Sequence, residues 1–496
     1  MENLIIILAI ALVVAVYTRA MGNPMGHPAA YMRRRTFNWV PLGITYALLY
    51  MGRYNLTVAK IAFGDVMSKS DFGTIFGVGS LVYACAFVVN GPLTDRIGGR
   101  AAMLIAAVGA GFANGLLGLF TYMKPHANIA LIFSLLYAIN MYFQSFGAVA
   151  IVKVNSHWFH VRERGMFGGI FGILISAGIF LAFQISQAIV DWLHKTAAPD
   201  GTTVVSPPYW VFWIPGLLLL GFALIDYLVV QDRPSRAGYA DIEVGDATSG
   251  ESEQRDPTLV VLKRILTNPI VLTIGAIEFC TGVLRQAIMH WYPILASNLG
   301  YYGSFFVTKN WGAIQFVAGA VGGMTAGWIS DKVFGSRRGP VAALLYGIMF
   351  VCAVAMAFMV PHPWALGVCV FLIAYCVIGT HGMLSGTASM DFGGTKNVGT
   401  AVGLIDGLVY LGTAFQSISL GFIIEKGHAF GLKGWSFGNV LKPDQVGWSL
   451  WPLFLLPFAA LGFLLAMRIW KAIPEAAKRR TVRPAVAGAA AGKAGE

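Results

Sequence analysis

The sequence has little charge: 12% of its 496 residues are Asp, Glu, Lys or Arg, whereas 57% are hydrophobic. Soluble domains carry roughly twice that share of charge, because a folded chain of this length keeps a large wetted surface. The composition therefore argues against a soluble enzyme, a disordered scaffold and a secreted disulfide domain. It predicts an all-α polytopic membrane protein.

Cysteine is also scarce, and the motifs of common catalytic chemistry are missing. The five cysteines all lie within apolar runs, so we expect no disulfide framework. We find no nucleophile–base pair, no metal-ligand cluster and no nucleotide-binding loop in the sequence. We therefore expect no enzyme activity, no cofactor and no metal, and any transport would draw its energy from gradients.

Twelve apolar runs after residue 36 are each long enough for a bilayer-spanning helix, which takes about 20 residues. They form two sets of six, 37–231 and 269–470, joined by a polar linker at 232–268 and followed by a basic tail at 471–496. The runs are 37–59, 72–92, 101–123, 129–151, 166–190, 209–231, 269–292, 304–329, 340–360, 364–386, 399–424 and 448–470.

One further apolar run, residues 4–17, lies in the preceding segment 1–36. It lacks the basic start of a secretory signal, because Glu2 precedes it and Arg19 follows it. We interpret it as an uncleaved extra amino-terminal helix. Because the run is short for a span, a helix lying in the membrane interface remains the alternative.

Lys and Arg are distributed unevenly between the two sides that these spans define. If the 37–59 span begins in the cytoplasm, 25 of them fall in cytoplasmic segments and 8 in external ones. Cytoplasmic loops of membrane proteins are enriched in Lys and Arg. We therefore expect a multi-pass protein of a bacterial cytoplasmic membrane with a cytoplasmic carboxyl terminus. The bias also explains the net charge of +12 without a nucleic-acid partner.

A short motif of Gly, Asp and basic residues occurs after the second span and again after the eighth. The two aspartates are 236 residues apart, as in a parallel repeat of two six-helix halves. An Asp among basic groups at a helix end can latch a gate. The first copy, GPLTDRIGGR, supplies Gly91, Asp95, Arg96, Gly98 and Arg100, and the second, GWISDKVFGSRRG, supplies Gly327, Asp331, Lys332 and Arg338. The pattern resembles motif A of the major facilitator superfamily, which implies that fold over about 37–470.

Each half also carries an arginine about 16 residues into a span, Arg53 in the first and Arg285 in the seventh. Charges within a bilayer are costly and usually functional. Two cations on opposite walls of a cavity repel each other unless an anion lies between them, and guanidinium groups fit phosphate or carboxylate oxygens. We predict an anion site here. Direct pairing with Glu278 is not expected, because two helical turns separate it from Arg285 by about 10.5 Å.

Polar side chains share the faces of these arginines. Tyr46, Tyr50 and Arg53 follow helical spacing, and other spans contribute Tyr83, Gln144 and Tyr410. Five features of the sequence resemble the organophosphate:phosphate antiporter family. They are the Tyr-x-x-x-Tyr-x-x-Arg face, the segment from Leu284 to Pro293, Gln144 followed by Lys153, the loop 157–165 and the segment GTAVGLIDGLVYLG (399–412). The resemblance implies exchange of an organic phosphate for inorganic phosphate. It implies that the two arginines hold the phosphoryl group in a cavity lined by Tyr46, Tyr50, Tyr83 and Tyr410.

Four positions depart from the glycerol-3-phosphate carriers of that family. Tyr54 and Phe87 stand where those carriers have lysines, Ile175 replaces a histidine and His290 replaces an aspartate. These changes point away from glycerol 3-phosphate itself and towards a larger or more apolar organic portion, or another anion.

Three other ionisable residues lie within spans: Glu278, His381 and Asp406. Desolvation favours the neutral form of an acid in a membrane. One hypothesis is that His381 or Asp406 carries a proton during transport; the alternative is that neighbouring groups satisfy each of them.

The favoured function is rocker-switch exchange of a small organic anion by a monomer in the bilayer. Three alternatives remain open: a proton- or sodium-coupled carboxylate carrier, a sugar-phosphate sensor of transporter fold, and a drug-efflux carrier, against which the two arginines argue.

Overall fold

The computed structural model describes residues 23, 25–123, 128–160, 163–195, 207–244, 257–335, 337–360, 362–427 and 443–471. Within these ranges all regular structure is helical, as the composition predicts. The extra helix expected at 4–17 and nearly all of the tail 471–496 lie outside the described residues.

The first half contains six long helical rods, and the fifth of them continues through a π-helical turn. They are α2 (Ala29–Phe63), α3 (Lys69–Ile97), α4 (Gly99–Tyr122), α5 (Ile129–Trp158), α6 (Arg164–Phe180) with η3 (Leu181–Ile185) and α7 (Ser186–Lys195), and α8 (Trp210–Val229). The linker that follows contains η4 (Pro234–Ala237) and α9 (Thr258–Leu266).

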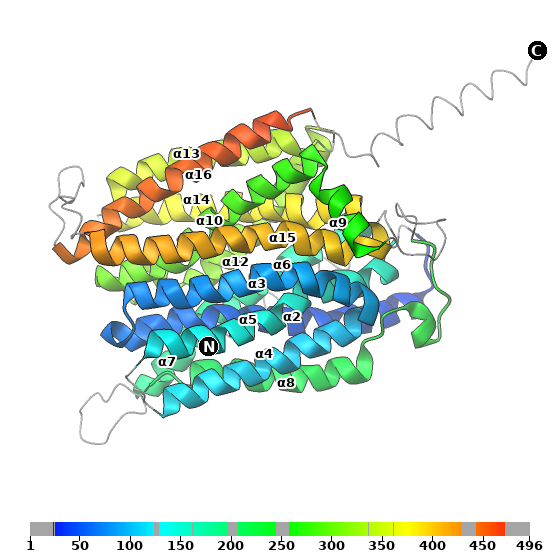
Figure 1. Cartoon of the computed structure of the whole chain (residues 1–496), viewed down its shortest axis with the longest axis horizontal. Coiled ribbons are helices and arrows are strands. Elements are labelled where there is room, and N and C mark those ends of the chain that lie inside the picture. The colour runs from blue at the N-terminus through cyan, green and yellow to red at the C-terminus, as the bar shows by residue number, and fades with distance from the viewer. Residues whose placement is uncertain are drawn as a thin grey trace, which may run out of the picture.

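The second half repeats this arrangement, with a π-helical turn after the fourth rod. Its rods are α10 (Pro269–Asn298), α12 (Trp311–Lys332) preceded by the short α11 (Phe306–Lys309), α13 (Arg338–Met359), α14 (Pro363–His381) with η5 (Gly382–Gly386), α15 (Thr387–Lys426), and α16 (Leu450–Arg468). In Figure 1 the rods run side by side, with the blue and cyan helices of the first half below the yellow and red helices of the second.

Eleven helical stretches among the described residues are long and apolar enough to cross a membrane. The remaining rod, α2, carries Arg53 and Asn55 near its middle, and both side chains are buried against protein rather than turned outward. With α2, these rods supply the twelve spans that the apolar runs predict. The chain is therefore a multi-pass α-helical membrane protein of two six-helix halves.

Two rods begin earlier than the apolar runs suggest. α2 starts at Ala29 rather than at residue 37, because Arg35 near its start is held by Glu163, with the Arg35 Nη1 atom 3.0 Å from both carboxylate oxygens. α15 starts at Thr387 rather than at 399, so a stretch that we expected to be a loop is helical. Hydropathy locates only the apolar part of a helix, so it does not detect a polar extension of the same helix.

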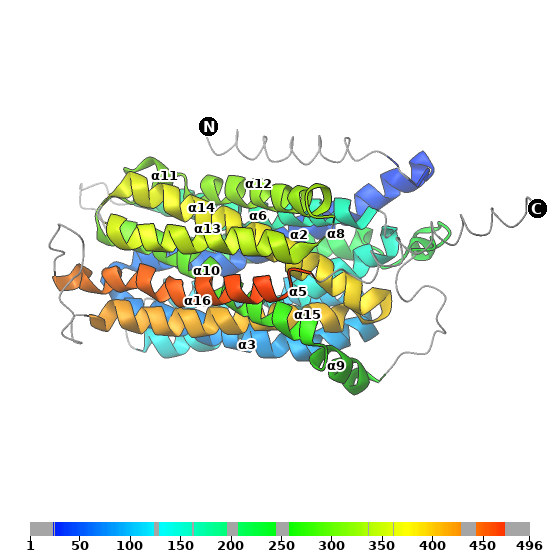
Figure 2. The same ribbon diagram turned by 90° about the horizontal axis from the view of Figure 1, so that it is seen from above.

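We name the two ends of the bundle after residues that lie there. The Asp95 end is where α2 and α10 begin, and the Lys309 end is the opposite one. α3 and α15, one from each half, lie side by side between these ends in both views (Figures 1 and 2). Their backbones touch near both ends, because Gly403 approaches the Phe87 carbonyl and Gly73 approaches Gly421. The halves are thus closed on each other at both ends.

Candidate functional site

Arg53 lies at the centre of the bundle and is held by three neutral side chains from three other helices. Its Nε atom donates to Gln144 Oε1 at 2.8 Å, one Nη atom donates to the Tyr83 hydroxyl at 2.9 Å, and the other donates to the Tyr410 hydroxyl. The side chain is 1% exposed. Of the residues that the sequence predicted around this arginine, Gln144, Tyr83 and Tyr410 are therefore in direct contact with it.

Aromatic rings surround the Arg53 guanidinium. Its central carbon lies 4.7 Å from the ring centroid of Tyr50 and 4.5 Å from that of Tyr83, within the range of cation–π attraction. Tyr46 lies one turn before Tyr50 on α2, where its ring packs 5.3 Å from Tyr50 and stacks 5.2 Å from Phe171. The structure thus places Tyr46 behind Tyr50, at the edge of this cluster.

Arg285 faces the same cluster from the second half. Its guanidinium carbon lies 5.7 Å from the Tyr410 ring centroid, and that of Arg53 lies 5.5 Å from the same centroid. The two guanidinium carbons can therefore be no farther apart than these two distances end to end, about 11 Å. Both guanidinium groups therefore border the same tyrosine ring, one from each half.

Arg285 differs from Arg53 in having donors to spare. It is 3% exposed, yet its Nε and one Nη atom are buried without a hydrogen-bond partner. Neither arginine forms an ion pair with any residue that the structure describes. An unpaired buried donor of a charged group is costly. Two donors of Arg285 are therefore left without an acceptor among the described residues, and an anion could supply one.

Glu278 does not neutralise Arg285. Its Oε2 atom instead pairs with His381 Nδ1 at 2.8 Å, across α10 and α14, while its Oε1 atom has no partner. Asp406 accepts a hydrogen bond from Ser385. The three ionisable residues that the sequence places within spans, Glu278, His381 and Asp406, are thus all held by neighbours in the second half.

The first motif copy bridges the two halves at the Asp95 end. One Asp95 carboxylate oxygen accepts from Lys153 Nζ at 2.7 Å, within the first half. The other accepts from the backbone N–H and the hydroxyl of Thr400 in α15, at 3.2 and 3.3 Å. Gly91 lies near Gly403 of the same helix. Asp95 therefore joins the two halves at this end of the bundle.

The other residues of that copy shape the α3–α4 turn. Gly98 adopts φ +93°, a left-handed conformation that glycine tolerates without strain, and so allows α4 to begin directly. The Arg100 N–H donates to Asp232 at 2.8 Å, and its guanidinium donates to the Tyr227 carbonyl, both near the end of α8. Arg96 points outward and is exposed. These contacts lie within the first half and its linker.

For the second motif copy, the structure describes a contact within its own half. Arg338 donates to the Met383 carbonyl at 3.2 Å, which joins the start of α13 to η5. Lys332 is exposed and Gly327 is partly buried, and the side chain of Asp331 lies outside the described residues. The two motif copies therefore occupy equivalent positions in the sequence of the two halves. The contact between the halves that the structure describes is made by Asp95 of the first copy.

At the Lys309 end, α2 and α10 close the centre from the other side. Gln286 Nε2 donates to the Tyr54 hydroxyl at 2.9 Å, and His290 Nδ1 lies 2.6 Å from the Thr57 hydroxyl. Two positions that depart from the glycerol-3-phosphate carriers, Tyr54 and His290, thus pair with residues of the opposite half. Nothing in the sequence singled out Gln286 or Thr57, because each is an ordinary polar residue in an apolar run.

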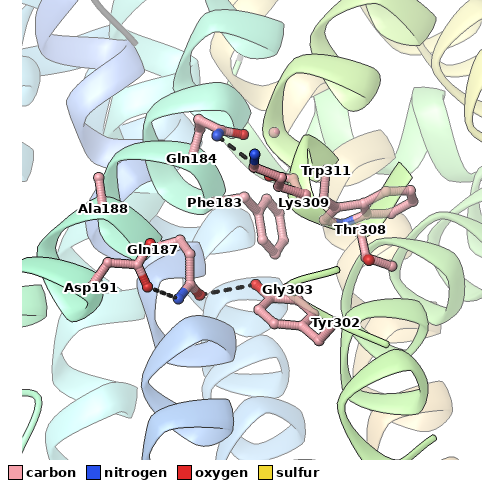
Figure 3. A pocket seen from close by; sticks show the side chains of 11 residues that line it. Phe183, Gln184, Gln187, Ala188, Asp191, Tyr302, Gly303, Thr308, Lys309 and Trp311 are labelled. Atoms are coloured by element: carbon pink, nitrogen blue, oxygen red, sulfur yellow. Dashed lines mark hydrogen bonds between the residues drawn. The ribbon is translucent and has the colours of Figure 1, made fainter. Parts of the chain in front are cut away.

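A pocket of about 350 Å³ opens at the Lys309 end, between the two halves. Figure 3 shows the Phe183 ring at its centre, between Gln187 and Asp191 of the first half and Lys309 and Trp311 of the second. Gln187 accepts from the Tyr302 hydroxyl at 3.1 Å, across the pocket. The Phe183 ring also lies 6.0 Å from the His290 ring, so it separates the pocket from the buried centre.

The described residues contain no group of three or more His, Cys, Asp or Glu that could hold a metal ion. What they do contain is a polar centre between two six-helix halves, with cross-half contacts above and below it. That arrangement defines a secondary transporter of the parallel-repeat class.

The sequence model of the Major Facilitator Superfamily matches residues 42–417, and the chain belongs to that superfamily. Among solved structures, a bacterial homolog of the human lysosomal transporter Spinster, in an inward-facing and occupied conformation, superposes with a TM-score of 0.64 at 12% identity. That superposition covers 88% of this chain and 96% of the other. The chain is thus a multi-pass membrane transporter and not an enzyme.

Several curated proteins are similar along most of their length. The membrane sensor protein UhpC of Salmonella typhimurium is 26% identical over 86% of this chain and 92% of its own. A probable hexose phosphate transport protein of Chlamydia pneumoniae is 24% identical over 89% and 92%. The glycerol-3-phosphate transporter of Bacillus subtilis is 24% identical over 80% and 88%.

Proposed function

We propose that the protein exchanges an organophosphate for inorganic phosphate across the membrane. The observation that carries the proposal is the state of Arg285, which is buried with unpartnered donors and shares Tyr410 with Arg53. Arginine keeps its charge in such a site and presents a planar fork that matches phosphoryl oxygens. The names of the similar transporters, which carry hexose phosphate and glycerol 3-phosphate, support the same substrate class.

The exchange would follow a rocker-switch cycle. At the Asp95 end the contact from Asp95 to Thr400 must break for the centre to open, and at the Lys309 end the contacts from Gln286 and His290 must break. An anion on both arginines draws the halves together and allows the passage from one opening to the other. We further propose that the Asp95 end faces the cytoplasm of a bacterial cell and that the carrier acts as a monomer.

Phosphate exchange in proteoliposomes tests the proposal. Vesicles loaded with unlabelled phosphate should take up labelled phosphate, and Arg53→Lys and Arg285→Lys should each abolish most of that uptake. Each substitution replaces a planar fork by a point charge, and charged hydrogen bonds contribute about 1.5–3 kcal/mol, so we expect losses of roughly 10- to 150-fold. Arg96→Lys, at an exposed position of the motif, is the matched control and should keep full exchange.

A second candidate is a sensor of transporter fold, because a relative with 26% identity is a membrane sensor protein. A sensor would bind phosphate esters, with the arginine variants losing that binding, and would show little exchange. Uptake that organic carboxylates inhibit and phosphate does not would instead indicate a carboxylate carrier.

A further inference from the structure

Another pocket, of about 610 Å³, lies at the Asp95 end, where the start of α2 meets the end of α8. Arg33 in its wall precedes Arg53 by 20 residues, which is about 30 Å of helix. The pocket is therefore well separated from the central cluster. Neither the proposed exchange nor the Asp95 contact uses the residues that line it.

Two arginines of α2 line this pocket. Arg34 is fixed, because its Nη2 atom donates to the Val229 carbonyl at the end of α8 at 2.8 Å, whereas Arg33 is exposed. In the part of the chain that the structure describes, neither of them forms an ion pair, although the next residue, Arg35, is paired with Glu163. The pocket wall thus carries two positive charges without a described carboxylate to balance them.

Beside the arginines, the pocket has an apolar wall that faces outward. Phe37 from α2 is 61% exposed, and Leu228 from α8 is 67% exposed. Phe37 lies one helical turn further into the span than Arg33, on the same face of α2. Exposed apolar side chains within a span contact acyl chains, whereas an arginine near the helix end reaches the headgroups. The pocket therefore straddles the boundary between hydrocarbon and headgroups.

The linker after α8 closes the pocket on its aqueous side. The Tyr239 hydroxyl donates to the Ala30 carbonyl at 3.4 Å, and the Tyr239 ring lies 5.9 Å from that of Tyr31. The backbone N–H of Tyr239 donates to the carbonyl of the buried Pro234 at 3.1 Å. The linker is thus folded against the start of α2. It adds a ring with an apolar body and a polar tip, a combination that suits headgroup depth.

We infer that this pocket binds the phosphate headgroup of an anionic phospholipid, with an acyl chain along Phe37 and Leu228. Guanidinium groups bind phosphate oxygens through charge-assisted hydrogen bonds, and basic pockets beside transmembrane helices recognise anionic headgroups. A lipid with a negative net charge balances the two arginines, whereas a zwitterionic headgroup brings its own cation. Free phosphate offers the same oxygens but no chain for the apolar wall. The inference is independent of what the protein transports.

Photo-crosslinking tests the site at its own residues. The full-length protein is reconstituted into phosphatidylcholine vesicles with a trace of phosphatidylglycerol that carries a diazirine in one acyl chain. Mass spectrometry should find the crosslink on peptides that contain Phe37 or Leu228. Unlabelled phosphatidylglycerol should suppress that crosslink at a mole fraction about 5-fold or more below that needed for phosphatidylethanolamine, given the usual attraction of one basic residue for an anionic surface.

Variants assign the preference to the pocket. Arg33→Gln should remove most of it, and Arg33→Lys, which keeps the charge, should retain part of it. Arg96→Gln is the matched control, because it removes one exposed arginine from the same end outside the pocket, and it should keep the preference of wild type. Since Arg33 is exposed, its variants should unfold at the Tm of wild type in phosphatidylcholine, which shows that they are folded.

Three results would overturn the site. They are equal suppression by the two lipids in wild type, a wild-type preference in Arg33→Gln, and an equal loss of preference in Arg96→Gln, which would trace the effect to net charge. Inorganic phosphate in the buffer separates a lipid from a free anion. The crosslink should persist when phosphate is added, and its loss would show that the pocket takes free phosphate instead of a lipid.

Discussion

Asp95→Asn should open the carrier at the Asp95 end. The carboxylate accepts two hydrogen bonds from Thr400 across the halves, at 3.2 and 3.3 Å, and one from Lys153 within its own half. Hydrogen bonds to a charged group are worth about 1.5–3 kcal/mol and neutral ones about 0.5–1.5 kcal/mol. Because the two cross-half bonds are long, we expect closure to weaken by roughly 1–3 kcal/mol, which is about 5- to 150-fold in the closed-to-open ratio.

Pulsed electron spin resonance can measure that ratio directly. Spin labels at Ile97 in the first half and Val333 in the second, both exposed positions at the Asp95 end, report the separation of the halves there. On a cysteine-free background, Asp95→Asn should shift the distance distribution towards longer values. Thr400→Val, which removes one of the two bonds, should produce a smaller shift in the same direction.

The lysine that remains needs a control of its own. Lys153 is 4% exposed, so Asp95→Asn removes a charged partner from a buried cation, and that change alone would disturb the helix ends. The double variant Asp95→Asn with Lys153→Met removes both charges and should open as far as the single variant. Arg96→Gln, at the exposed next position, should leave the distances unchanged. Distances equal to wild type in Asp95→Asn, Thr400→Val and the double variant would refute the latch.

Three further outcomes follow from single contacts. Gly73→Val should loosen closure at the Lys309 end, because a Cβ at Gly73 would lie 2.5 Å from the Ser417 carbonyl oxygen. Chemical labelling of a cysteine introduced at that end should then become faster, and an unchanged labelling rate would contradict this. Asp406→Asn and His381→Ala should flatten the pH dependence of uptake if either carries a proton, and two unaltered pH profiles would exclude it. Glu163→Gln should cost about 3–5 kcal/mol of stability, read as a lower Tm, because it breaks a fully buried ion pair.

The apolar pattern of the sequence predicts the fold, because a bilayer forces each run of about 20 apolar residues into a helix. It also places Arg53 and Arg285 correctly in the interior, since a charge in a span turns away from lipid. The double motif predicts where the halves meet, and Asp95 is indeed the cross-half contact there. The helices, the buried arginines and the motif positions depend on local sequence or on the repeat of the two halves. Both can be read from a single sequence.

Pairings across helices could not be predicted in the same way. Glu278 meets His381, which is 103 residues away, and Tyr410 reaches Arg53 over 357 residues. Such contacts depend on how each helix is rotated about its axis and on which helices adjoin. The hydrophobic pattern of a helix buried on nearly all sides says little about rotation. The pairings of Gln286 with Tyr54 and of His290 with Thr57 likewise become visible only when the neighbouring helices are known.

The unused donors of Arg285 bear on why such a carrier should exchange its substrate rather than leak it. In the closed centre two donors of a charged group lack partners, at about 1–3 kcal/mol each, so an empty closed state is disfavoured by roughly 2–6 kcal/mol. An anion supplies the missing acceptors, whereas in an open state water does so. The empty carrier should therefore change sides roughly 30- to 2 × 10⁴-fold more slowly than the loaded one. Efflux of labelled phosphate into phosphate-free buffer, compared with efflux into phosphate, measures that ratio. Equal rates would show that the Arg285 donors do not hold back the empty carrier.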